Sequence, residues 1–178
     1  MELPEIYLLR HGVTVAHMQG VTAGTLETEL TPLGHEQARA AGKFLRRIQL
    51  KKIFSNPQTR ARQTTVSLEL DVPIEYDDRI KEMCYGIFEG RDYKTCAEGG
   101  LTFTRIFADH SLRFPKSESY AEVEERARSF IEEKIKTESE PVVIVTHSAF
   151  GKIFLATLLP HLREKVGGFS LGYADVIC

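Results

Sequence analysis

VVIVTH, at residues 142–147, is β-branched from Val142 to Thr146 and apolar up to that threonine. Such a run is typical of a central parallel strand that is buried on both faces. A helix is expected to follow at about residues 149–159. His147, placed directly after the strand, is either a core histidine with a satisfied hydrogen bond or part of a ligand site. The ligand site is favoured, because ligands bind beyond the carboxyl ends of parallel strands.

Outside this stretch, short apolar runs alternate with amphipathic segments. Strands are expected at residues 5–9, 52–55, 74–76, 168–172 and 174–177. Helices are expected from Thr31-Pro32 to about Ile48, from Asn56-Pro57 to about Leu70, and from the Ser119-Glu122 capping box to about Ile135. Residues 80–116 show no regular spacing of apolar residues over a long stretch, which indicates mostly loop with short helices. The alternation predicts an α/β fold, a three-layer α/β/α sandwich around a mainly parallel, mixed sheet, in a single domain over residues 1–178.

The composition excludes several classes of protein. The chain has 178 residues, 42% hydrophobic and 27% charged, with a formal net charge of -2 from 23 basic and 25 acidic side chains. This balance does not indicate binding to nucleic acid or to an anionic membrane. No apolar run approaches the roughly 20 residues that span a bilayer. The opening MELPEIYLLRHG lacks the basic region and long apolar stretch of a signal peptide.

The cysteines are too few and too scattered for a metal site or a disulfide framework. Cys84, Cys96 and Cys178 form no CxxC pair and no even set. They are interpreted as reduced thiols of a cytoplasmic protein. No metal and no cofactor are therefore expected, and the sequence indicates no oligomeric state.

Arg10-His11-Gly12, directly after the first expected strand, carries the strongest chemical signal. A histidine is a covalent nucleophile when one ring nitrogen is unprotonated and an acceptor fixes the other. The neighbouring arginine offers a planar fork of donors that matches phosphate oxygens. Gly12 permits either a close backbone approach or a positive φ. By itself the tripeptide is equally compatible with a surface histidine in a turn.

Arg60 and Glu82 are ambiguous when each is taken alone. Arg60 is expected one turn inside its helix, where the free N–H groups and the dipole favour anions. A solvated helix arginine is the simpler interpretation, and Arg62 fits it as well. Glu82 stands in the irregular segment KEMCYGIFEG. The like charge of a bound phosphate would favour its protonated form and suit a general acid, although an exposed glutamate is the better interpretation of that residue alone.

Taken together and in chain order, these segments resemble the histidine phosphatase superfamily, the phosphoglycerate mutase-like proteins. The likeness covers nearly the whole chain, with a contribution from SESYAEVEER at 117–126. It is carried by LLRHGVT at 8–14, LTPLGHEQA at 30–38, FSNPQTRARQT at 54–64 with KEMCYGIFEG at 81–90, and IVTHSAFG at 144–151.

The resemblance implies a role for each candidate residue. His11 would be the nucleophile that forms a phosphohistidine, and Glu82 would be the proton donor. Arg10, Arg60 and His147 would surround the phosphoryl oxygens, where fixed cationic donors stabilise the transition state without a metal. Thr14, His17 and Ser148 are added as candidate substrate-binding residues, beside Arg10 and Arg60.

The chain departs from the family pattern at several positions. Members often have Glu-Thr after the Arg-His-Gly motif and an asparagine soon after, where this chain has Val13, Thr14 and His17. The usual Gly-Arg-x-Gln-Gly is reduced to QGVTAG at 19–24, and the usual Gly-Glu-Ser begins with Ser117. Arg10, His11, Arg60 and His147 are intact. The departures therefore concern the groups that complete the phosphate cage and the choice of substrate.

Three functions are compatible with this resemblance. The leading one is a metal-independent phosphomonoesterase, of the histidine acid phosphatase type, acting on a small phosphorylated metabolite. The second is a phosphoglycerate mutase, but family mutases resemble longer chains whose tail shields the phosphoenzyme, and only 31 residues follow His147 here. The third is a non-catalytic domain that binds a phosphorylated ligand, which usually requires a lost catalytic residue.

The substrate is left open among a sugar phosphate, phosphoglycerate, α-ribazole phosphate and a phosphoprotein. Residues 91–118 are one candidate wall of the pocket, because loops over a strand-end crevice often carry specificity. The alternative is a solvated surface loop whose aromatic residues pack on the core. The side chains concerned are Arg91, Lys94, Arg105, His110, Arg113 and Lys116, with Phe103, Phe107 and Phe114 between them.

Overall fold

A five-stranded sheet forms the centre of the computed structural model, which describes residues 3–163, 165, 168 and 170–178. Its strands are β1 (Ile6–Arg10), β2 (Lys52–Ser55), β3 (Ile74–Tyr76), β4 (Val142–Thr146) and β5 (Val176–Ile177). The spatial order is β3-β2-β4-β1-β5. The first four strands are parallel to one another, and β5 is antiparallel to β1. The predicted mainly parallel, mixed sheet is confirmed.

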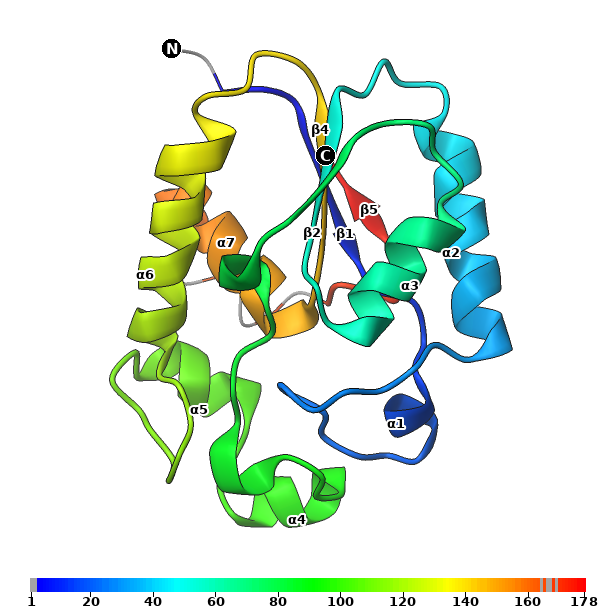
Figure 1. Ribbon diagram of the computed structural model, residues 1–178. Coiled ribbons are helices and arrows are strands. Elements are labelled where there is room, and N and C mark those ends of the chain that lie inside the picture. The colour runs from blue at the N-terminus through cyan, green and yellow to red at the C-terminus, as the bar shows by residue number, and fades with distance from the viewer. Residues whose placement is uncertain (1–2, 164, 166–167, 169) are drawn as a thin grey trace.

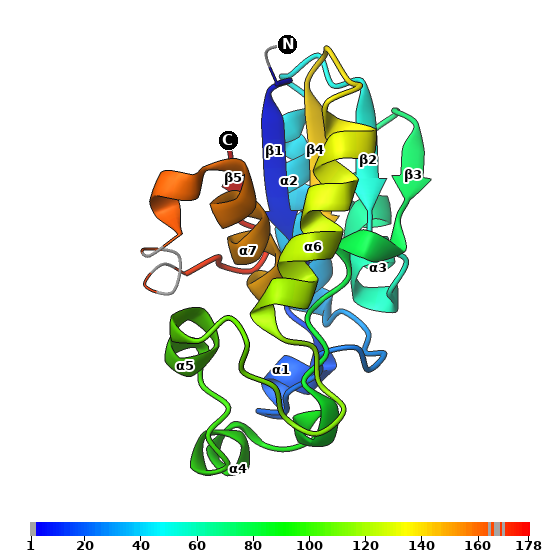
Figure 2. The ribbon, with the colours of Figure 1, turned by 90° about the vertical axis from the view of Figure 1, so that its left-hand side faces the viewer.

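Helices cover both faces of this sheet (Figure 1). They are α1 (Val15–Met18), α2 (Pro32–Leu45), α3 (Thr59–Ser67), α4 (Tyr93–Glu98), α5 (Phe103–Ala108), α6 (Tyr120–Phe130) and α7 (Ser148–Leu158). α2 and α3 lie on one face, and α6 and α7 lie on the other, which confirms the three layers. Figure 2 shows α1, α4 and α5 beyond the carboxyl ends of β1 and β4. None of the described helices is long and apolar enough to cross a bilayer.

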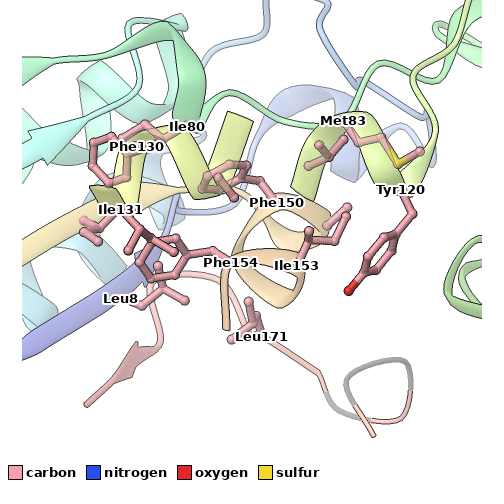
Figure 3. Close-up of a cluster of buried hydrophobic side chains, with 14 of the residues drawn as sticks. Leu8, Ile80, Met83, Tyr120, Phe130, Ile131, Phe150, Ile153, Phe154 and Leu171 are labelled. Carbon is pink, nitrogen blue, oxygen red and sulfur yellow. The ribbon is translucent and has the colours of Figure 1, made fainter. Parts of the chain in front are cut away.

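β4 lies at the middle of the sheet and all five of its residues are buried. Val143 and Val145 belong to the apolar cluster beneath α2 and α3, whereas Val142 and Ile144 belong to the cluster beneath α6 and α7. Figure 3 shows part of the cluster beneath α6 and α7. A strand buried on both faces has no polar alternation, which explains the continuous apolar run in its sequence.

Two of the predicted helix starts are confirmed in detail. The Thr31 side chain accepts a hydrogen bond from the Gly34 N–H, and Pro32 is the first residue of α2. Ser119 and Glu122 form the reciprocal capping box of α6. These caps satisfy N–H groups that have no partner inside the helix, so a local sequence signal is sufficient to place them.

The predicted helix start at Asn56-Pro57 is wrong, because α3 begins at Thr59. The Asn56 side chain accepts a hydrogen bond from the Gln58 N–H at 3.1 Å and also contacts His147. Asn56 therefore organises a turn before the helix instead of capping its first residues. Arg60 is consequently the second residue of α3 and does not lie a full turn inside it.

The end of the chain also differs from the prediction. Residue 169 of the expected strand at 168–172 lies outside the described residues, and 170–172 form no strand. The expected strand at 174–177 is limited to Val176–Ile177. Side-chain hydrogen bonds hold this segment where strand pairing was expected. Arg10 Nη1 donates to the Leu171 carbonyl, and the Asp175 carboxylate accepts from the Gly172 N–H.

Candidate active site

The loops that follow β1, β2 and β4 meet at the carboxyl edge of the sheet. The His11 N–H donates to the Thr146 carbonyl at 3.0 Å, and the Asn56 N–H donates to the Val145 carbonyl at 3.1 Å. A cavity of about 580 Å³ lies in this region. Of the predicted site residues, its wall includes Arg10, His11, Thr14, His17, Arg60, Glu82 and Ser148. The sheet therefore brings together residues that are up to 138 positions apart, from Arg10 to Ser148.

The His11 ring is held in one tautomer by its own loop. Nδ1 lies 2.8 Å from the Gly12 carbonyl oxygen, which only accepts hydrogen bonds, so Nδ1 carries the proton. Nε2 is then the unprotonated nitrogen. Burial and the nearby Arg60 and Arg10 guanidinium groups lower the pKa of His11 well below its usual value. The ring is therefore neutral near pH 7, as a nucleophile must be.

Arg10 is the cation with the most unused donors at the site. Only Nη1 has a partner within the described part of the chain, the Leu171 carbonyl at 2.7 Å, and the buried Nε has none. The Tyr173 ring lies 3.6 Å beneath the guanidinium and orients its plane. Such an arrangement leaves one side of the fork available for an anion.

Arg60 is almost fully buried and most of its donors are already used. It donates to the Leu26 carbonyl at 2.9 Å, the Gly24 carbonyl at 2.6 Å and the Gln58 side chain at 3.4 Å. Its Nε donates to His147 Nδ1 at 3.2 Å. An arginine has five N–H donors, so one, on Nη1, remains for a ligand. The carbonyl groups fix the direction of that donor.

His147 is completely buried and lies behind His11, with 5.1 Å between the ring centroids. Nδ1 accepts from Arg60, so Nε2 carries the proton and donates to Asn56 Oδ1 at 3.1 Å. Burial lowers the pKa of His147 well below its usual value, with Arg60 as the next cause. Direct contact with a phosphoryl group would require one of these two bonds to be exchanged for the substrate.

Glu82 is buried beside the first turn of α7. Its carboxylate accepts from the Met83 N–H at 2.9 Å, the Ala149 N–H at 3.2 Å and the Phe150 N–H at 3.0 Å. Two of these donors are free N–H groups of the helix N-terminus, which attract a carboxylate. The side chain is thus fixed on the cavity wall and is not the exposed glutamate that its sequence context alone favours.

The added substrate-binding candidates also lie on the cavity wall. Thr14 is buried and caps α1 by accepting from the His17 N–H at 3.2 Å. The His17 ring lies 4.6 Å from the Tyr173 ring and 3.3 Å from the Tyr93 hydroxyl, measured from Nδ1. Ser148 is the first residue of α7.

The departures from the family pattern fall in different places. His17 faces the cavity, whereas Val13 and Ser117 do not line it. The Val13 N–H donates to Gln37, and the Ser117 hydroxyl accepts from the Phe114 N–H at 2.9 Å. The change at His17 therefore alters the surface that a ligand meets, and so does the reduced segment QGVTAG, whose residues 21–24 also line the cavity.

Residues 91–118 do form part of the wall, but through their uncharged members. Phe103 faces the cavity, while Phe107 and Phe114 pack against the core. None of the six basic side chains of this segment lines the cavity. Arg113, for example, pairs with Glu122 at 2.7 Å on the surface. Both interpretations of the segment are thus correct for different residues.

Several site residues were not indicated by the sequence. Tyr173 stands in a segment with no recognisable pattern, and Lys152 occupies an interior position of a helix. Asn56 and Gln58 belong to the NPQTR segment, where a helix cap was the simpler interpretation. A polar run directly after a buried strand was the one signal that pointed to them. Among the described residues, no group of three or more His, Cys, Asp or Glu side chains is arranged to hold a metal.

Comparison with known proteins identifies the class of protein. The model of the histidine phosphatase superfamily, branch 1, matches residues 6–178. The chain belongs to this family, and it is a phosphatase of the phosphoric monoester hydrolase class. Its relatives act on small phosphorylated metabolites.

Two relatives and one solved structure show how similar this chain is to known phosphatases. A putative phosphoserine phosphatase 2 of Hydrogenobacter thermophilus is 31% identical over 149 residues, which are 82% of this chain and 73% of that protein. A glucosyl-3-phosphoglycerate phosphatase of Mycolicibacterium vanbaalenii is 28% identical over 89% of this chain and 76% of its own length. The structure of a mycobacterial glucosyl-3-phosphoglycerate phosphatase with VO3 superimposes with a TM-score of 0.86 at 28% identity, covering 96% of this chain and 90% of that one.

Proposed function

We propose that the protein hydrolyses a small phosphate monoester without a metal ion, through a phosphohistidine on Nε2 of His11. The observation that carries this proposal is the hydrogen bond from His11 Nδ1 to the Gly12 carbonyl. It leaves Nε2 unprotonated in a ring that belongs to the cavity wall. The relatives named above are phosphatases and support the same reaction class.

Phosphoryl transfer to His11 requires donors for the charge on the phosphoryl oxygens. Arg10 offers its unused N–H groups, and Arg60 offers one N–H held in place by backbone carbonyls. Such preorganised donors stabilise the transition state because they need no reorganisation during the reaction. His147 keeps Arg60 in position through the Nε–Nδ1 bond, so we assign it mainly a positioning role.

In the first step, the lone pair of His11 Nε2 attacks phosphorus and the P–O bond to the substrate carbon skeleton breaks. The leaving alkoxide takes a proton from the protonated Glu82 carboxyl group and departs as the alcohol. In the second step, water attacks the phosphohistidine, Glu82 accepts its proton, and the P–N bond breaks to release inorganic phosphate. Thr14, His17 and Ser148 contact the bound substrate on the cavity wall.

The cellular setting is part of the same proposal. The three cysteines are free thiols, which agrees with a cytoplasmic enzyme that meets a soluble metabolite. Neither nucleic acid nor a membrane is proposed as a partner. A mutase would return the phosphoryl group to an acceptor hydroxyl, and the names of the two relatives support hydrolysis.

The test is phosphate release from p-nitrophenyl phosphate by the wild type and by His11→Ala. We expect turnover by the wild type, unchanged after extensive chelation, and almost none by the variant. Circular dichroism of both proteins controls for folding. Activity that disappears with a chelator and returns with one divalent ion would contradict the metal-free mechanism.

A further inference from the structure

Lys152 is a largely buried residue on the wall of the cavity. Its residue is only 5% exposed, and its ammonium group makes no ion pair with the described residues. It lies over the rings of Phe103 at 4.9 Å and Phe107 at 5.7 Å. These rings come from α5, which lies beyond the end of α7 nearest the site (Figure 2).

A lysine that is largely withdrawn from water and lacks an ion-pair partner is costly. Transfer of a charge out of water costs more free energy than contact with aromatic rings returns. Burial and the Arg10 charge lower the pKa of Lys152, and the Glu82 carboxylate opposes this shift without cancelling it. Lys52 shows the ordinary solution for a half-buried lysine in this chain, since its ammonium lies 2.6 Å from Glu138 and 3.3 Å from Glu75. A ligand with an anionic group would supply what Lys152 lacks.

The location of Lys152 specifies where that anionic group would bind. Ser148 and Lys152 are four residues apart on α7, about 6 Å along the helix axis, and both line the cavity. Helical side chains lean toward the N-terminus of their helix, so the ammonium group extends toward the end at which His11 and Glu82 lie. Arg10 and Arg60 already serve the phosphoryl group in the proposed function.

We infer that Lys152 binds a second anionic group of the substrate, a carboxylate or a second phosphate, a few bonds from the phosphoryl group that His11 attacks. This inference rests on the proposed function for the identity of the first group. It restricts the substrate to phosphomonoesters that carry two anionic groups. Phosphomonoesters whose remaining groups are neutral are then poor ligands.

Calorimetric titration of the His11→Ala protein tests the inference without interference from turnover. One pair of ligands is 3-phosphoglycerate and glycerol 1-phosphate, which differ by a carboxylate in place of a hydroxymethyl group. The other pair is fructose 1,6-bisphosphate and fructose 6-phosphate, which differ by the second phosphate. We expect the member with two anionic groups to bind about tenfold more tightly or better in at least one pair, as for a charge-assisted hydrogen bond.

The same titrations are then repeated with Lys152→Met and with Lys152→Arg added to His11→Ala. Methionine keeps the length and packing of the side chain but removes the charge, so the preference should fall by about tenfold. Arginine should retain most of it. Lys52→Met is the matched control. Lys52 is the first residue of β2, at the end of the strand far from the cavity, so this variant should leave the preference intact.

The pair that shows the preference identifies the second group as a carboxylate or a phosphate. An equal affinity for both members of each pair, or a preference that survives Lys152→Met, would overturn the inference. Binding too weak to measure for all four ligands would overturn it as well. Failure of the proposed function is recorded separately, as the absence of phosphate release by the wild type.

Discussion

Arg10 and Arg60 differ in how many donors each can offer to a phosphate. Arg10 has one hydrogen-bond partner among the described residues, whereas Arg60 has four. Arg60 therefore supplies a single, tightly directed N–H. Arg62, two residues further along α3, is exposed and lies over the Tyr76 ring at 5.6 Å.

Arg60→Ala should cost about 2–4 kcal/mol in transition-state stabilisation, as expected for the loss of one preorganised donor. Arg62→Ala should leave kcat/KM nearly unchanged, because residues two apart on a helix point in different directions. Steady-state kinetics with p-nitrophenyl phosphate on both variants provides the comparison. Equal losses in the two variants would show that the assignment of Arg60 is wrong.

Glu82→Gln should affect substrates according to their leaving group. An alkoxide is a strong base and needs a proton as the P–O bond breaks, whereas a nitrophenolate hardly needs one. General acid catalysis is worth about 10²–10⁴-fold, so phosphorylation of His11 by an alkyl phosphate should fall by that factor and by nitrophenyl phosphate much less. Single-turnover phosphorylation rates measure both. An equal loss for the two substrates would leave Glu82 with a positioning role only.

Among the elements, the loop after β1 and the start of α2 are held in backbone contact. A Cβ at Gly12 would lie 2.4 Å from the Gly34 carbonyl oxygen, so the close approach is the reason for this glycine, and a positive φ is not. The Gly12 N–H also donates to the Thr64 hydroxyl of α3 at 3.1 Å. Two helices thereby fix the loop that carries His11.

Gly12→Ala should lower both the free energy of unfolding and the activity. The added methyl group must displace α2, which costs about 1–3 kcal/mol for overpacking. The displacement also moves the carbonyl that holds His11 Nδ1. Urea unfolding followed by circular dichroism and kcat/KM for p-nitrophenyl phosphate are the measurements. A variant with wild-type stability would contradict the close packing described for Gly12 and Gly34.

The elements that could be predicted from sequence are those with local causes. β4 follows from its apolar run, and α2 and α6 follow from the caps at Thr31 and Ser119. The start of α3 could not be predicted, because the Asn56 side chain bonds to His147, 91 residues away. Tyr173 and Lys152 reach the cavity only through the packing of distant segments, which no periodicity records.

The two buried histidines make the stability of the folded protein depend on pH. The pKa of His11 and that of His147 lie well below the usual value in the folded protein. Between those lowered values and about pH 6.5, the unfolded chain binds more protons than the folded one. The contribution of these two histidines to the free energy of unfolding is therefore fully present above this window and is lost as the pH falls through it.

Within this window, each of these histidines changes the free energy of unfolding by at most about 1.4 kcal/mol per pH unit. His11→Asn removes one of them, so the loss of stability between pH 7.5 and pH 5.5 should be smaller in this variant than in the wild type. Urea unfolding at several pH values gives both slopes. Parallel curves would mean that His11 is not held neutral by the fold.

In the proposed mechanism, His11 carries the phosphoryl group between the two steps. The direct measurement is mass spectrometry of the wild type mixed briefly with p-nitrophenyl phosphate and quenched at alkaline pH, where a P–N bond survives. The expected result is one phosphoryl group on the peptide that contains His11, lost after acid treatment and absent in His11→Ala. A phosphoryl group on another residue, or undiminished turnover by His11→Ala, would contradict the mechanism.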